Sequence, residues 1–160
     1  MNANVYKVYN EQVQAEFYSA YLYLAMSMDM EAKEYKGMAS WLYKQYEEER
    51  EHALKLVKFM QERGVKPVML EIVQPPSEFG TPLELFTKVL EHEKYVTSRI
   101  KSMYEVAAAE KDYAAMINLQ WFIEEQVEEE DNASSVVAKL AMAKDDTAAL
   151  LMVDGQLGTR

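Results

Sequence analysis

Residues 42–60 read LYKQYEEEREHALKLVKFM, and this stretch decides the fold class. Leu42 and Leu56 lie two heptads apart, which places them on one apolar face of an amphipathic helix. Glu49 lies midway between them, so a carboxylate falls inside the apolar stripe. His52 follows Glu49 by three residues and therefore shares its face. A carboxylate in this position predicts that something positive lies opposite it.

The same interruption occurs in the other long segments of the chain. Each has an apolar series at seven-residue spacing with a glutamate near its middle. The series are Tyr9, Glu16, Tyr23 and Met30; Leu42, Glu49 and Leu56; Phe86, Glu93 and Ile100; and Phe122, Glu129 and Val136. Because each glutamate lies toward the middle of its segment, all of them can meet at one level of an antiparallel bundle.

Glycine and proline define the predicted elements, since they are scarce elsewhere and gather between residues 64 and 82. The sequence predicts helices over 4–33, 37–63, 82–110 and 112–143. Gly64 ends the second helix, and Thr81 is the expected N-cap of the third, with Pro82 at its first position and Glu84 at its third. A short fifth helix is expected over about 145–154, beginning at Asp145 or Asp146 and ending before Gly155.

These elements predict an all-α fold with one domain over residues 1–160. The four-helix bundle would occupy about 4–143, and the short C-terminal fifth helix would follow it. The segment between the second and third helices holds about 17 residues, which suits a long crossover along the bundle rather than a tight hairpin.

Charge and composition exclude several classes of function. The chain has 17 Lys and Arg against 27 Asp and Glu, a net charge of −10, which argues against binding nucleic acid or anionic membranes and fits a cationic partner. It has no cysteine and only two histidines, so cysteine-based zinc sites, iron–sulfur clusters and three-histidine zinc sites are excluded. No secretory signal or membrane-spanning run is visible, and a cytoplasmic protein is expected.

The interrupting glutamates need compensation from outside the chain. Burying one unpaired carboxylate costs several kcal/mol, and four would exceed the roughly 5–15 kcal/mol of net stability of a domain. The predicted stripes carry no lysine or arginine, so two divalent ions are the better counter-charge for Glu16, Glu49, Glu93 and Glu129. Oxygen donors with one imidazole suit iron or manganese.

Over nearly its whole length the sequence resembles the bacterial non-haem ferritins, which belong to the ferritin-like di-iron proteins. Four segments carry the resemblance, and they are Glu16–Phe–Tyr–Ser–Ala–Tyr–Leu–Tyr23, Glu47–Glu–Glu–Arg–Glu–His52, His92–Glu93 and Gln120–Trp–Phe–Ile–Glu–Glu–Gln–Val–Glu–Glu–Glu130. The general pattern has two Glu-x-x-His motifs, whereas here the fourth helix offers Gln126 and Glu129 instead of the second.

The resemblance implies a ferroxidase centre that oxidises Fe(II) with O₂ or H₂O₂. One iron would bind Glu16, Glu49 and His52, and a second would bind Glu49, Glu93 and Glu129, with Gln126 close by. A third iron site toward the cavity would use Glu48, Glu125, Glu128 and Glu129. The tyrosine and tryptophan that the family has beside the centre match Tyr23 and Trp121.

The resemblance also implies iron storage in a hollow homo-oligomeric shell of twenty-four subunits, whose four-fold axis the fifth helix would line. No haem is expected, because Arg50 stands where bacterioferritins have a haem-binding methionine. Met116 and Leu119 stand where animal ferritins have an acidic pair at the three-fold pore, so the resemblance leaves the iron entrance open.

Other interpretations of the residues stay open. The same centre could serve a non-storage di-iron oxidase or peroxidase, or the bundle could be an interaction module without metal. Tyr23 could be a core residue or a redox residue, Trp121 is expected to be packing, and His92 is expected at the surface. Taken singly, Glu47, Glu48, Glu51, Glu124 and Glu130 are expected on solvated faces.

Overall fold

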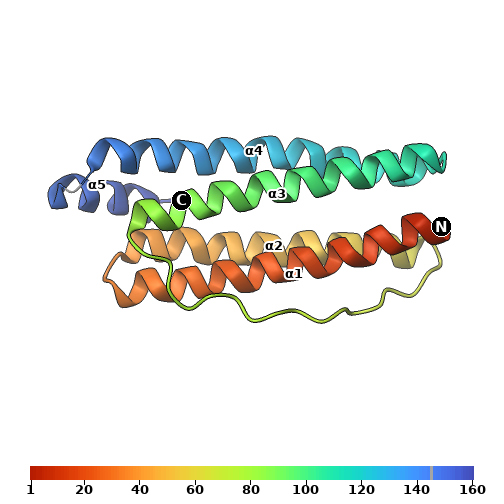
Figure 1. The fold of residues 1–160 in the computed structure, drawn as a ribbon, viewed down its shortest axis with the longest axis horizontal. Coiled ribbons are helices and arrows are strands. Elements are labelled where there is room, and N and C mark those ends of the chain that lie inside the picture. The colour runs from red at the N-terminus through yellow and green to blue at the C-terminus, as the bar shows by residue number, and fades with distance from the viewer. Residues whose placement is uncertain (145) are drawn as a thin grey trace.

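The computed structural model describes residues 1–144 and 146–160, and in that part of the chain all regular secondary structure is helical (Figure 1). The helices, in chain order, are α1 (Ala3–Ala32), α2 (Lys36–Glu62), α3 (Pro82–Ala109), α4 (Tyr113–Ala143) and α5 (Thr147–Leu157). The first four lie side by side as a bundle, and α5 packs at one end of it (Figure 1). The all-α prediction is confirmed, with the bounds of the four long helices correct to within one residue.

The helix ends follow local chemistry that the sequence already contained. α2 ends at Glu62, and Gly64 terminates it as predicted, because its φ of 71° lets the Val65 amide donate to the Met60 carbonyl at 3.1 Å. α3 begins with the expected capping box, because the Thr81 amide donates to Glu84 Oε2 at 2.7 Å and the Glu84 amide donates to Thr81 Oγ1 at 3.3 Å. These caps fix where the long crossover begins and ends.

The crossover between α2 and α3 runs along the whole bundle beside α1 (Figure 1). The Tyr6 hydroxyl donates to the Lys66 carbonyl at 2.8 Å, and the Val68 amide donates to Asn10 Oδ1 at 2.7 Å. α2 and α3 consequently point the same way, antiparallel to α1 and α4, and the middles of all four lie at one level (Figure 1).

The expected end of the fifth helix is wrong, since α5 continues through Gly155 to Leu157. Val153 and Leu157 are both buried against the bundle, and this packing outweighs the roughly 1 kcal/mol cost of a glycine inside a helix. At its start, Asp146 accepts from the Ala149 amide at 3.0 Å as an N-cap, which agrees with the second predicted start. The alternative start, Asp145, lies outside the described residues.

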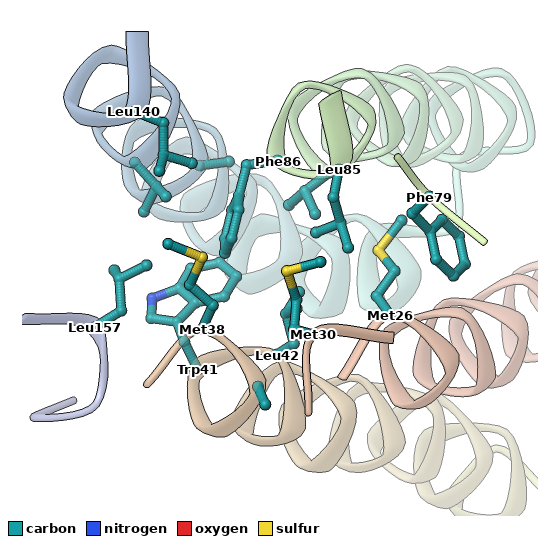
Figure 2. Close-up of a cluster of buried hydrophobic side chains, with 14 of the residues drawn as sticks. Met26, Met30, Met38, Trp41, Leu42, Phe79, Leu85, Phe86, Leu140 and Leu157 are labelled. Carbon is teal, nitrogen blue, oxygen red and sulfur yellow. The ribbon is translucent and has the colours of Figure 1, made fainter. Parts of the chain in front are cut away.

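Two apolar clusters fill the two ends of the bundle. We call the first the α5-end cluster (Figure 2), and it includes Met26, Met30, Met38, Trp41, Leu42, Phe79, Leu85, Phe86, Leu140 and Leu157. The opposite cluster includes Val5, Tyr9, Val13, Leu56, Met60, Val96, Ile100, Leu119 and Phe122. Between the two clusters lies a level of the bundle whose buried side chains are polar.

Candidate metal centre

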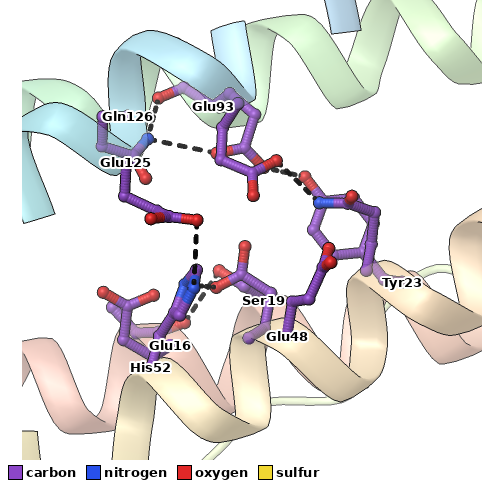
Figure 3. A network of polar contacts seen from close by, with 12 residues as sticks. Glu16, Ser19, Tyr23, Glu48, His52, Glu93, Glu125 and Gln126 are labelled. Carbon is purple, nitrogen blue, oxygen red and sulfur yellow. Dashed lines mark hydrogen bonds and ion pairs between the residues drawn. The ribbon is translucent and has the colours of Figure 1, made fainter. Parts of the chain in front are cut away.

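The four glutamates that interrupt the apolar stripes all point into this polar level. Glu16 of α1, Glu49 of α2 and Glu93 of α3 are each 1% exposed, and Glu129 of α4 is 3% exposed. The bundle geometry therefore brings together one buried carboxylate from each long helix, and Figure 3 labels Glu16 and Glu93 among them. Among the described residues, no lysine or arginine lies within ion-pair distance of any of the four.

Three of the predicted site residues form a compact group of donor atoms. One ligand atom each from Glu16, Glu49 and His52 lies within 4.8 Å of the other two, and all three side chains are buried. His52 Nδ1 lies 3.6 Å from Glu49 Oε2, because their three-residue spacing places both on one face of α2. Two carboxylates and one imidazole converging in this way are a suitable ligand set for a divalent transition metal.

Glu49 is the most exceptional side chain of the group. In the part of the chain that the structure describes, its Oε2 is the buried side-chain atom that no hydrogen-bond donor reaches. Burial raises the pKa of Glu49 well above its usual value, and the nearby charges of Glu16 and Glu93 raise it further. A buried carboxylate oxygen without a donor, surrounded by other carboxylates, is suited to bind a cation.

Glu93 and Glu129 complete the centre from α3 and α4. Burial raises the pKa of Glu93 to about 7, although hydrogen bonds from Tyr23 and Gln126 oppose the shift. Burial raises the pKa of Glu129 to about 8, with a further contribution from the charge of Glu93. Near neutral pH the metal-free centre therefore holds protons that a bound cation would displace.

The two predicted polar neighbours, Gln126 and Tyr23, both contact Glu93. Gln126 Nε2 donates to Glu93 Oε2 at 3.2 Å, and the Tyr23 hydroxyl donates to Glu93 Oε1 (Figure 3). Tyr23 is fully buried, and burial raises its pKa well above 10. Each group holds one oxygen of the same carboxylate. A cavity of about 280 Å³ between α3 and α4 reaches Gln126.

The aromatic surroundings place Trp121 beside the centre and correct the prediction for His92. The indole of Trp121 lies edge-on to the His52 ring with centroids 5.3 Å apart. The expectation that His92 lies at the surface is wrong, because its ring is largely covered and packs edge-on against Tyr23 at 5.8 Å. His92 Nε2 also lies 2.7 Å from Ser19 Oγ, and burial lowers the pKa of His92 to about 4.

The glutamates predicted for a third iron site lie at the margin of the centre. Glu125 Oε1 is 3.9 Å from His52 Nε2, whereas Glu128 is exposed. Glu48 Oε2 accepts a hydrogen bond from Arg160 Nη2 at 2.7 Å. The third site stays a prediction.

Sequence reasoning missed two buried glutamines that touch the centre. Gln12 Nε2 donates to Glu16 Oε1 at 2.8 Å, and Gln45 Nε2 donates to Glu129 Oε2 at 2.8 Å. Gln12 lies four residues before Glu16, and Gln45 lies four residues before Glu49, so both share the buried face of their helix. That spacing was a signal for a polar residue inside the apolar stripe.

Comparison with known proteins agrees with this geometry. The model of the family described as "Ferritin-like domain" matches residues 7–143. The chain belongs to the ferritin-like family. A bacterial non-heme ferritin of Bacteroides fragilis is 41% identical over 151 residues, covering 94% of each chain. A bacterial non-heme ferritin of Staphylococcus aureus (strain MRSA252) is 33% identical over 160 residues, covering 100% of this chain and 96% of that one.

Solved ferritin structures match the fold of the whole chain. The open-pore ferritin of the hyperthermophilic archaeon Archaeoglobus fulgidus superimposes with a TM-score of 0.99 at 41% identity, covering 100% of this chain and 99% of the other. A closed form of that ferritin, engineered by site-directed mutagenesis, gives a TM-score of 0.98 at 42% identity and covers 100% and 98%. The predicted ferritin-like bundle is thereby confirmed. Within the described residues, each helix is too short or too polar to cross a bilayer.

Proposed function

We propose that this chain is an iron-storage ferroxidase, which binds ferrous iron at the buried carboxylate centre, oxidises it and stores the ferric product. Membership of the ferritin-like family supports iron storage and ferroxidase activity. The observation that carries the proposal is Glu49 Oε2, a buried carboxylate oxygen that no donor reaches among the described residues. A cation between Glu16, Glu49 and His52 would supply the missing partner.

Two ferrous ions would occupy the centre, with Glu49 shared between them. One ion would be held by Glu16, Glu49 and His52, and the other by Glu49, Glu93 and Glu129. Four carboxylates offset the charge of two divalent ions, so the filled centre is electrically balanced and the cost of burying the carboxylates is removed. Gln126 and Tyr23 support this arrangement because each fixes one oxygen of Glu93.

Oxidation follows from the hardness of the donor set. Each ferrous ion loses one electron, and the oxidant, O₂ or H₂O₂, takes up the electrons together with protons. Carboxylate oxygens stabilise the ferric ion more than the ferrous ion, because the smaller and more highly charged ion gains more from anionic oxygen. The carboxylates therefore favour the oxidised state.

Storage requires a closed assembly, and we propose a cytoplasmic shell of twenty-four copies with an acidic interior. The net charge of −10 and the exposed glutamates of the helices support an acidic inner surface on which ferric oxide can nucleate. A third iron site at Glu48, Glu125, Glu128 and Glu129 would lie between the centre and that interior. The named relatives support a ferritin assembly through their family.

Aerobic addition of Fe²⁺, followed by the absorbance of the ferric product, tests the activity. The Glu49→Ala variant should fall to the rate of iron autoxidation in buffer, because it removes the ligand shared by both ions. Glu47→Ala is the matched control, since Glu47 is exposed on the same helix and should leave the rate unchanged. A Glu49→Ala variant as fast as the wild type refutes the site assignment.

The native mass after iron loading separates storage from oxidation without storage. A twenty-four-subunit assembly that retains iron supports the storage function. A monomer or dimer that still oxidises iron supports instead a di-iron oxidase that uses the same centre on another substrate.

A further inference from the structure

Two arginine–glutamine pairs flank the metal centre on opposite sides. On one side, Arg99 Nε donates to Gln12 Oε1 at 2.9 Å, and Gln12 Nε2 donates to Glu16 Oε1 at 2.8 Å. On the other side, Arg160 Nη1 donates to Gln45 Oε1, and Gln45 Nε2 donates to Glu129 Oε2 at 2.8 Å. Both chains of contacts run from an arginine through a buried amide to a carboxylate of the centre.

The order of donors and acceptors permits only one orientation of each amide. Arginine can only donate hydrogen bonds, so the amide oxygen must face the arginine, and the amide nitrogen is then left to donate to the glutamate. Gln12 is 0% exposed and Gln45 is 1% exposed, so water does not offer either amide an alternative partner. Each arginine therefore fixes a donor that points at the centre.

We propose that Arg99 with Gln12, and Arg160 with Gln45, are positioning residues that hold Glu16 and Glu129 in the geometry that binds iron. Each relay occupies one oxygen of its carboxylate and leaves the other for the ion. It also brings part of an arginine's positive charge toward the centre without placing a competing cation there. This inference rests on the proposed function and identifies which residues outside the ligand set tune it.

The two arginines are themselves anchored from other elements. Arg99 Nη2 also donates to the Glu11 carbonyl at 3.0 Å, which ties α3 to α1. Arg160 Nη2 donates to Glu48 Oε2 at 2.7 Å, and its guanidinium lies 4.9 Å from the Trp41 ring centroid. The second relay thus joins the residues that follow α5 to a carboxylate of α4, so the position of α5 is coupled to the centre.

Cobalt binding provides a test that does not depend on iron oxidation. Co²⁺ titration, followed by visible absorption and calorimetry, should show that Gln12→Met weakens cobalt affinity by about 10- to 100-fold. Methionine has similar volume and no donor, so packing is largely kept. Arg99→Gln should weaken affinity by about 10-fold, and Arg99→Lys should restore part of the loss. The same pattern is expected for Gln45→Met, Arg160→Gln and Arg160→Lys.

A double-mutant cycle shows whether each arginine acts through its glutamine. If it does, Arg99→Gln added to Gln12→Met causes no further loss of cobalt affinity. Arg63→Gln is the matched control, because Arg63 makes two hydrogen bonds to Asp112, at 2.8 and 3.0 Å, near one end of the bundle. This variant should lower the melting temperature and leave cobalt affinity unchanged.

Several outcomes would overturn the relays. Unchanged cobalt affinity in both Gln→Met variants would overturn them. So would an Arg→Gln substitution that lowers cobalt affinity as much in the Gln→Met background as in the wild type. If a glutamine variant does not fold, the arginine variants alone decide. In that case, a loss of cobalt affinity in the Arg→Gln variant that the Arg→Lys variant does not partly restore counts against the relay. A wild-type protein that binds no cobalt contradicts the relays and the proposed function together. One that binds cobalt but does not oxidise iron contradicts only the proposed function.

Discussion

The α5-end cluster and the metal centre are equally dry, yet burial has opposite consequences in the two regions. Leu42 is 0% exposed and Glu49 is 1% exposed, and they lie one heptad apart on the same stripe of α2. Burying the leucine stabilises the fold by about 1.5–3 kcal/mol. Burying the glutamate without a partner costs several kcal/mol. The same face of α2 thus buries an apolar side chain that stabilises the fold and a carboxylate that needs a partner from outside the chain.

This contrast shows how the bundle can hold a costly site. The two apolar clusters lie on either side of the polar level and supply the stability that the metal-free centre reduces. Functional sites commonly break the rules that the surrounding structure obeys. We therefore expect stability and metal binding to respond differently in the two regions to substitution, pH and added metal.

The largest effect is expected in the α5-end cluster. Phe86 is fully buried and packs edge-on against Trp41 with centroids 5.4 Å apart, so Phe86→Ala should lower the free energy of unfolding by about 3–5 kcal/mol. Because Phe86 is not part of the centre, the number of Co²⁺ ions bound per folded chain should stay unchanged. Urea unfolding of the metal-free protein, at one protein concentration, and a cobalt titration measure the two properties. Loss of cobalt binding in a folded Phe86→Ala variant would contradict the separation of the two regions.

The long helices and the four central carboxylates could be predicted from the sequence, because both follow from local periodicity. Glu16, Glu49, Glu93 and Glu129 interrupt otherwise apolar heptads, and a helix turns that spacing directly into a shared face. The Thr81 capping box and the Gly64 ending are similarly local. Burial of all four glutamates at one level was therefore foreseeable without a structure.

Contacts between distant segments could not be predicted in the same way. The end of α5 depends on how Val153 and Leu157 pack against the bundle, which the local signal of Gly155 does not contain. His92 is covered by side chains of α1 that no pattern on α3 reveals. Arg160 is 115 residues from Gln45, so only the folded chain shows that a basic side chain approaches the centre.

An intermediate effect is expected from pH, and it should appear only at the metal centre. The folded pKa values of Glu93 and Glu129, about 7 and 8, lie above the usual 4.5, so the folded state binds more protons than the unfolded state between these values. Stability of the metal-free protein must therefore fall as pH rises, by about 1.4 kcal/mol per pH unit for each carboxyl that is still protonated when folded. Above their folded pKa values Glu93 and Glu129 should contribute no further slope, and any slope that remains belongs to Glu49, whose pKa is also raised by burial.

Melting temperatures of metal-free protein between pH 6.5 and 8.5 test this trend. This range avoids the opposing effect of His92, whose pKa burial lowers from the ordinary 6.5 to about 4. The unfolded chain gains a proton at this histidine as pH falls through 6.5, so His92 lowers stability only below that pH. Glu129→Gln should flatten the profile and raise stability at pH 8, because the amide carries no charge to bury. The exposed Glu47→Gln is the control and should leave the slope as in the wild type. A steeper profile in Glu129→Gln would contradict the raised pKa.

The smallest expected effect is a change in tryptophan fluorescence on metal binding. It distinguishes the two regions because each contains one of the two tryptophans. Trp121 lies 5.3 Å from the His52 ring, whereas Trp41 packs within the α5-end cluster. Paramagnetic Co²⁺ quenches nearby indoles most strongly, so its binding should lower the emission of Trp121 more than that of Trp41. The Trp41→Phe variant should keep most of the quenching, and Trp121→Phe should lose most of it. Equal quenching in both variants would place the bound ion away from His52. It would then remove the distinction between the buried cluster that stabilises the fold and the buried centre proposed to bind metal.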